Sequence, residues 1–204
     1  MREYFVDQYD EFLRQKKKIL TFLNFNKGFP EQIFKSESHA YLFHEFEWVL
    51  SQDGWNAIKM LSVATGNNTI HLSMVDDWDY SKETLRKYGC SFMAKLPISL
   101  SGDEFEDLLI EEIGKTNDSL RIVLNKAVIY PESLDWIIYV EREHELGVLA
   151  INNHQLKQQH LEEWLPLGEE IIDLVSVVFR DKLVPLRFKF LLEKNYGGNL
   201  HKEV

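Results

Sequence analysis

Apolar residues recur at helical spacing near the start of the chain. The positions concerned are Phe5, Tyr9, Phe12, Leu13, Ile19, Leu20 and Leu23. This spacing places them on one face of an amphipathic helix, with the lysines at 16–18 on or beside the polar face. Gly28 and Pro30 follow, and both are typical of the end of a helix. The pattern therefore predicts an amphipathic helix over residues 3–24.

Residues 40–75 show the alternation of apolar and polar positions that is typical of strands. The apolar positions are Leu42, Phe46, Trp48 and Leu50, then Ile58 and Met60, then Ile70, Leu72 and Met74. We expect strands over 40–50, over 57–64 and around Ile70–Met74, although the first segment also fits a helix. Asp53-Gly54 and Gly66-Asn67 are turn signals between them. The region therefore predicts a β-meander.

The middle of the chain combines a short helix, an alternating segment and a clear helix start. We expect a short helix over 82–88 and a strand over 91–100, in which Pro97 indicates an edge strand or a bulge. Ser101 and Glu104 then form a capping-box pattern that begins a helix running to about residue 113.

Two further strand segments and a helical region complete the pattern. Residues 121–130 and 135–152 alternate as strands, with the charged segment 141–145 turning within the second. From residue 154 the spacing is helical with a break at Pro166, and 185–192 fits either a strand or a last helix. Strand groups joined by hairpins rather than regular βαβ units predict an α+β fold with a mainly antiparallel sheet and packed helices.

Length and composition are those of a folded protein. The chain has 204 residues, is 45% hydrophobic and shows no linker, which predicts one α+β domain over residues 1–204. It has a single cysteine, no secretory signal and no apolar run long enough to cross a membrane. We therefore expect a cytoplasmic protein without an internal disulfide and without membrane association.

The net charge of −10 is unevenly distributed along the chain. Residues 28–179 hold 11 basic and 26 acidic residues, a net of −15, whereas 1–27 carry +2 and 180–204 carry +3. Nucleic-acid binding needs clustered lysines and arginines, so this layout argues against it. An acidic body fits solubility, and it also fits attraction of a basic protein partner.

Motifs that would name a reaction or a cofactor are missing from the sequence. There is no phosphate-binding loop, no nucleophile elbow and no pair of histidines at metal-ligand spacing. His44-Glu45 begins like a zinc-binding helix, but Trp48 stands where the second histidine is needed. Cys90 has no base beside it in sequence and is interpreted as a partly buried structural thiol. We expect no cofactor and no metal.

The segment Asp76, Asp77, Trp78, Asp79 and Tyr80 is the first candidate site. It follows a predicted strand, and its three carboxylates could hold Mg²⁺ or Ca²⁺, but the spacing is not that of an EF-hand loop. Its aromatic residues offer contact area and its acids offer negative charge, the combination found at binding hot spots. A solvated loop with Trp78 folded onto the body is the alternative.

A second acidic cluster lies on the helix predicted to start after Ser101. Its members are Asp103, Glu104, Glu106, Asp107, Glu111 and Glu112. The first two also suit the amino end of a helix electrostatically, but the later ones gain nothing there. Glu106 and Glu111 are therefore candidate binding residues on the outer face of this helix, although ordinary helix polarity also explains them.

These features favour a non-catalytic, acidic protein-binding module. One example is an inhibitor or immunity-type protein that masks a cationic nuclease, by physical analogy alone. The alternative is an enzyme, such as a hydrolase, with a metal-assisted or acid/base site that converges from Asp76, Asp77, Asp79 or His71. The sequence leaves the partner, any substrate and the oligomeric state open.

Overall fold

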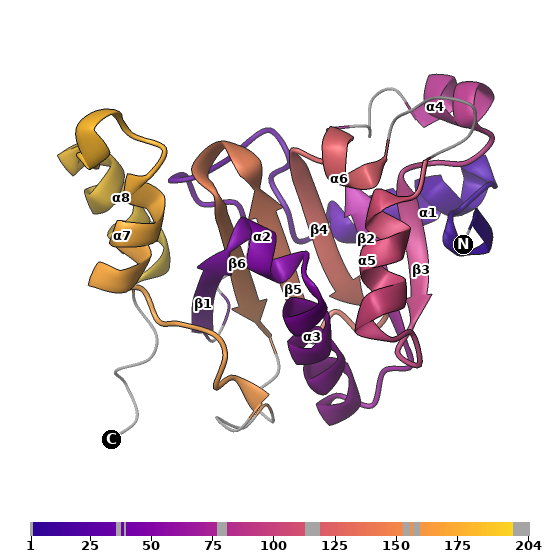
Figure 1. Ribbon diagram of the computed structural model, residues 1–204, viewed down its shortest axis with the longest axis horizontal. Coiled ribbons are helices and arrows are strands. Elements are labelled where there is room, and N and C mark those ends of the chain that lie inside the picture. Colours follow the sequence, from indigo (N-terminus) through magenta and orange to yellow (C-terminus); the bar gives the residue numbers. More distant parts are fainter. Residues whose placement is uncertain are drawn as a thin grey trace.

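The computed structural model describes residues 2–35, 38, 40–76, 81–112, 119–152, 156 and 160–197. Within these ranges six strands form one sheet, in the order β1-β6-β5-β4-β2-β3, and every neighbouring pair is antiparallel (Figure 1). The strands are β1 Ala40–Glu45, β2 Thr69–Met74, β3 Met93–Pro97, β4 Lys126–Pro131, β5 Trp136–Glu141 and β6 Leu146–Ile151. The α+β fold with an antiparallel sheet is confirmed.

Helices account for most of the remaining described residues. The α-helices are α1 Tyr9–Ile19, α2 Phe46–Val49, α3 Gln52–Ala64, α4 Ser81–Tyr88, α5 Gly102–Ile110, α6 Leu120–Val123, α7 Glu169–Ser176 and α8 Leu186–Tyr196. Short 3₁₀ turns cover Arg2–Tyr4, Arg142–His144 and Arg180–Lys182. None of the helices in these ranges has the length and apolar character needed to cross a membrane.

Helices cover both faces of the sheet. The helices α3 and α5, with the short α2 and α6, lie across one face (Figure 1). The other face is covered by α1 behind β2 and β3, and by α7 and α8 beyond β1 (Figure 1). Two hydrophobic clusters fill these two layers. Strand β6 is buried at every position because it is covered on both sides.

Strand β2 shows how alternation assigns residues to the two layers. Ile70 and Leu72 belong to the cluster under α3 and α5, whereas the buried His71 and Ser73 point to the layer of α1. The edge position predicted for Pro97 is confirmed, because β3 is the last strand of the sheet. A proline there removes no ladder hydrogen bond from a central strand.

The predicted β-meander over 40–75 is wrong in its centre. The first strand ends at Glu45, and the segment predicted as the second strand belongs to helix α3. The side chains of Trp55, Ile58 and Leu61 are fully buried and lie on one stripe of that helix. Short apolar runs fit both periods, so packing decided between them.

The expected turn at Asp53-Gly54 is instead the first turn of α3. Ser51 caps the helix by accepting a hydrogen bond from the Gly54 N–H at 3.2 Å. A Cβ at Gly54 would lie 2.1 Å from the carbonyl oxygen of Trp48. The glycine is required by the close approach of α2 to α3, and the second predicted turn, at Gly66, is present with a φ of 69°.

Other boundaries differ more modestly. The amino-terminal helix is shorter than predicted, because residues 5 and 6 form bridges and hydrogen bonds with β3 before α1 begins. The strand predicted over 121–130 begins only at Lys126, after the short helix α6. The capping box at Ser101 and Glu104, the short helix α4 and the β5–β6 hairpin are confirmed.

Candidate functional site

Only the first residue of the predicted 76–80 site lies within the described part of the chain. Asp76 follows β2, and its Oδ2 accepts a hydrogen bond from the Lys126 N–H at 3.1 Å. Partial burial raises the pKa of this carboxyl group against the lowering effect of Lys126. Asp76 thus joins the end of β2 to the start of β4, and Asp77, Trp78, Asp79 and Tyr80 lie outside the described residues.

The two predicted binding residues of the second cluster lie on and just after α5. Glu106 accepts a hydrogen bond from the Gln52 N–H at 3.1 Å, which satisfies a free amide at the amino end of α3. Asp103 accepts a hydrogen bond from the side chain of Gln52 at 2.6 Å. These contacts tie α5 to α3, and Glu111 is exposed directly after the last turn of α5.

The outer surface of α5 is strongly acidic. Residues 96–112 contain six acids and no lysine or arginine. The carboxylates of Asp103, Glu104 and Glu106 take their hydrogen bonds from neutral groups of Ser101 and Gln52, so they keep their charge. Hydrogen bonds from Ser101 also hold the pKa of Glu104 below its ordinary value.

Two arginines near this surface are already engaged in ion pairs. Arg121 of α6 forms an ion pair with Glu47 at 2.5 Å, and Arg142 lies 3.5 Å from the same carboxylate. Lys59 of α3 donates a hydrogen bond to the neutral carbonyl oxygen of Leu100 at 3.3 Å, which does not offset its charge. The four carboxylates of α5 therefore outnumber the single unpaired lysine of α3.

Apolar side chains are exposed on α5 and on the two helices that pack against it. They are Met60 and Val63 on α3, Ile110 at the end of α5 and Ile122 on α6, with exposed fractions from 49% to 68%. The helices that carry them pack against one another across the front of the sheet in Figure 1. We call this set, together with the acids of residues 103–112, the acidic-apolar surface.

Two helices of the opposite layer carry the opposite charge. Helix α1 has four lysines and arginines and two acids, and α8 has three and one. Helix α5 has four acids and no base. Helix α7 of the same layer has three acids and no base, so the positive charge of this layer belongs to α1 and α8. A field of this kind orients an approaching charged partner before contact.

A buried carboxylate at the end of β5 was missed by the sequence analysis, which assigned 141–145 to a charged turn. Glu141 is 1% exposed, with Lys126 Nζ at 3.0 Å and the Phe29 N–H at 2.8 Å. Burial alone would raise the pKa of Glu141, but His144, Phe29 and Lys126 outweigh burial and hold it below its ordinary value. A charged residue continuing the apolar run of β5 was the only sequence signal.

Glu141, Glu143 and His144 bring three potential metal-ligand atoms within 4.8 Å of one another. The Lys126 ammonium and the Phe29 amide already bind the Glu141 carboxylate, and a lysine at 3.0 Å repels a cation. The nearby backbone of Gly28 also leaves little room, since a Cβ there would lie 2.5 Å from Glu141 Oε1. The geometry thus fits a structural anchor better than a metal centre.

His71 and Asp76, the described residues of the enzymatic alternative, take separate partners. His71 is 2% exposed, stacks on Tyr130 with 5.0 Å between ring centroids, and contacts Glu132 at 2.8 Å. Glu132 also binds Lys18 at 2.7 Å, whereas Asp76 binds the backbone of β4 near Lys126. Burial lowers the pKa of His71 against the raising effect of Glu132. His71 and Asp76 are thus held at different places by different groups.

Two further residues from the motif search have structural surroundings. Cys90 is 1% exposed, so it is buried more completely than expected. His44 stacks on Trp48 with 3.6 Å between ring centroids, and Trp164 packs edge-on against both rings. Burial lowers the pKa of His44 to about 4, so this imidazole is neutral at physiological pH.

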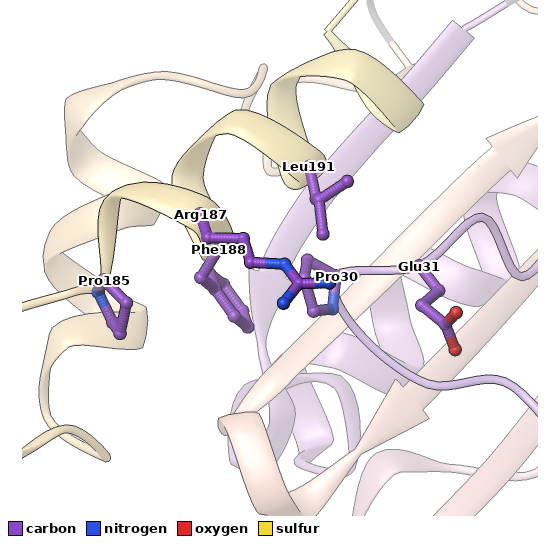
Figure 2. Close-up of a pocket in the computed structure, with 6 residues that line it drawn as sticks. All are labelled: Pro30, Glu31, Pro185, Arg187, Phe188 and Leu191. Carbon is purple, nitrogen blue, oxygen red and sulfur yellow. The ribbon is translucent and has the colours of Figure 1, made fainter.

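A pocket lies between helix α8 and the segment that contains Pro30 and Glu31. Its volume is about 370 Å³, and Figure 2 shows its lining of Pro30, Glu31, Pro185, Arg187, Phe188 and Leu191. No residue in this lining is a histidine or cysteine that could act as a base or nucleophile. Its chemistry is that of an apolar recess with charged groups at its margin.

Comparisons with family models, with characterised proteins and with solved structures found no match for this chain.

Proposed function

We propose that this protein is a non-catalytic binding module that covers a basic surface of another protein with its acidic-apolar surface. The observation that carries the proposal is the exposure of Met60, Val63, Ile110 and Ile122 on α3, α5 and α6, since α5 packs against the other two helices and carries four carboxylates. Exposed apolar groups inside a charged field are the composition of a protein interface, in which an apolar centre is surrounded by a polar rim.

The charge of this surface indicates which class of protein it would bind. The carboxylates of α5 are held by neutral donors, and nearby Arg121 is engaged by Glu47. A cationic partner would therefore meet the negative charge of α5, which speeds encounter and excludes acidic competitors. An inhibitor or immunity-type protein that masks a cationic enzyme belongs to this class.

The tight packing of α3 against α5 supports such a role. Gln52 joins α3 to α5 through Glu106 and Asp103, and Trp55 stacks on Phe105 with 4.6 Å between ring centroids. An interface built on packed helices loses little conformational freedom on binding, which leaves more of the interaction energy for affinity.

The test begins with capture of partners from a native lysate, followed by binding kinetics with the purified partner. Ile110→Ala should weaken binding by about 1–2 kcal/mol, mostly through faster dissociation. Asp107→Asn combined with Glu111→Gln should slow association and flatten its dependence on salt, because solvated charges act over about 10 Å at 0.1 M ionic strength. All three side chains are exposed, so the fold should be unaffected.

A matched control removes the same number of charges from the opposite layer. Asp10→Asn with Glu83→Gln alters exposed acids of α1 and α4 and should leave the kinetics unchanged. If the control slows association as much as the α5 variant, only net charge matters and the proposed surface is wrong. Trp78→Ala, tested in the same assay, would show whether the 76–80 segment contributes to the same interface.

A further inference from the structure

The chain exposes a group of apolar side chains where it passes from α7 to α8. Val177, Leu183, Leu186 and Phe190 have exposed fractions of 59%, 72%, 85% and 63%. They lie directly after α7, in the connection, or in the first two turns of α8. Single exposed apolar residues are normal on a protein surface, whereas a group of them is typical of an interaction site.

Both helices bury one stripe and expose the opposite one. Ile171 and Val175 of α7 enter the same hydrophobic cluster as Phe188 and Leu192 of α8. Phe179 packs against Phe188 at the connected end of the pair, with 5.2 Å between ring centroids. The two helices lie beyond β1 and are joined at the upper end of the view in Figure 1. Their outer stripes therefore both face away from the sheet.

The outer stripe of α7 leads from negative charge to an apolar side chain. Glu169, Glu170 and Asp173 are exposed, and α7 contains no base. Val177 follows one turn after Asp173, so it continues the same stripe toward the connection. The acids thus lie at the end of α7 that is remote from the connection.

The outer stripe of α8 has the reverse order and the opposite charge. Leu186 and Phe190 lie one turn apart, and the exposed Lys194 follows one turn later. Helix α8 has three bases and one acid. Among the described residues no ion pair joins the acids of α7 to the bases of α8, so both sets of charges are available. The helix pair therefore has an apolar end and an end with separated charges of both signs.

We propose that α7 and α8 form the interface of a symmetric dimer of this chain. A two-fold axis along the helix pair places α7 of one copy against α8 of the other. The apolar side chains of the two connections then meet, and the acids of each α7 face Lys194 of the partner subunit. Every contact occurs twice in such an interface, which doubles the effect of each residue.

The separated charges favour a second copy over other occupants. A uniformly acidic or uniformly basic partner would be attracted by one helix and repelled by the other. An anionic lipid surface would also be repelled by the three acids of α7. A copy related by a two-fold axis meets each charge with its opposite. This dimer is independent of the function proposed for the acidic-apolar surface, because α5 covers the other face of the sheet.

Sedimentation velocity of the full chain over a wide range of concentrations tests the dimer. We expect a reversible equilibrium between monomer and dimer, with amide resonances of α7 and α8 that shift with concentration. Phe190→Ala should weaken self-association by about tenfold or more, because each copy loses an apolar anchor. Leu13→Ala is the matched control, since that apolar side chain is exposed on α1, and it should leave the equilibrium unchanged.

Charge reversal tests which helices face each other. Asp173→Lys and Lys194→Glu should each weaken self-association by about fivefold or more, since attraction becomes repulsion at two places. A mixture of the two variants should associate more tightly than either variant alone, because each reversed charge then meets its opposite. Both side chains are exposed, so the fold should be unaffected.

A chain that stays monomeric at every concentration would overturn the proposal, as would full self-association in Phe190→Ala. A mixture of the charge variants that binds no more tightly than its components would overturn the pairing of α7 with α8. Self-association that Ile110→Ala abolishes would place the interface on the acidic-apolar surface instead. Sedimentation with phosphatidylserine vesicles that Phe190→Ala abolishes would overturn the dimer in favour of a membrane.

Discussion

The backbone N–H of Phe29 donates a hydrogen bond of 2.8 Å to the carboxylate of Glu141, which lies 112 residues further along the chain. This contact fixes the segment after α1 to the end of β5, beneath α8. Lys126 binds the same carboxylate from β4, so one buried charge joins three segments. Removing a partner from such a site leaves the others buried without compensation.

We expect Glu141→Gln to lower the free energy of unfolding by roughly 2–3 kcal/mol, because Lys126 loses its buried counter-charge while hydrogen bonding is partly retained. Urea unfolding at neutral pH measures this. Glu143→Gln is the control, since that side chain is exposed two positions away and should change stability by less than about 0.5 kcal/mol. Equal effects in the two variants would contradict the anchoring role.

The contribution of Glu141 should also depend on pH. Its pKa in the folded protein lies below the ordinary value, so the unfolded chain binds the proton more readily. The stability due to the charged form is therefore complete above the ordinary pKa of about 4.3 and is lost as the pH falls through the folded pKa. The difference in stability between wild type and Glu141→Gln should be constant near pH 7 and shrink in acid. A difference that grows in acid would show the opposite shift.

Gly28→Ala tests the closeness of the same contact. The added Cβ would lie 2.5 Å from Glu141 Oε1, so the Phe29 hydrogen bond or the carboxylate must move. We expect a loss of about 1–3 kcal/mol in thermal or urea unfolding. Gly168→Ala is the matched control, because its nearest atom would be 3.9 Å away. If Gly28→Ala left the free energy of unfolding unchanged, this segment would be able to shift away from Glu141.

His44 should titrate far below an ordinary histidine. Burial lowers its pKa to about 4, so the Cε1 proton resonance should move near pH 4 rather than near 6.5. Because the unfolded chain binds this proton first, the stability due to neutral His44 is complete above about pH 6.5 and declines between 6.5 and 4. His44→Gln should remove that part of the decline. A midpoint near 6.5 in wild type would contradict the stacked, desolvated position.

The Ser101 side chain caps α5 by accepting a hydrogen bond from the Glu104 N–H at 3.2 Å, and Ser101→Ala removes this cap. We expect a loss of about 1 kcal/mol in the free energy of unfolding. Ser101→Thr keeps the hydroxyl and should restore most of it. If both variants lose the same amount, the hydroxyl contributes nothing and packing at this position decides.

Local patterns identified the elements whose own residues decide their structure. The capping box at Ser101 needs only residues within one turn, and the β5–β6 hairpin needs only two neighbouring alternating segments. Both were predicted. The segment 57–64 was predicted wrongly because its apolar residues fit a strand and a helix equally well, and contacts with the distant helix α5 decided the outcome.

The candidate sites also combine features that the sequence indicated with features that it could not show. The sequence indicated Glu106 and Glu111 because they extend an acidic helix, but it could not show Gln52 bound to Glu106. The exposure of Ile110 and Phe190 was also hidden, because an apolar residue in an amphipathic pattern is expected to face the core. Glu141 was hidden for the converse reason, since a charged residue is expected in water.

The sequence by itself determined the α+β class, the antiparallel pairing and the separation of charge along the chain. These follow from turn residues, side-chain alternation and composition, which act over a few residues or over the whole chain at once. Only the tertiary structure decided that α5 and α8 carry opposite charges on different layers, and that Phe29 meets Glu141. Such relationships depend on which distant segments pack together, and no local pattern contains that information.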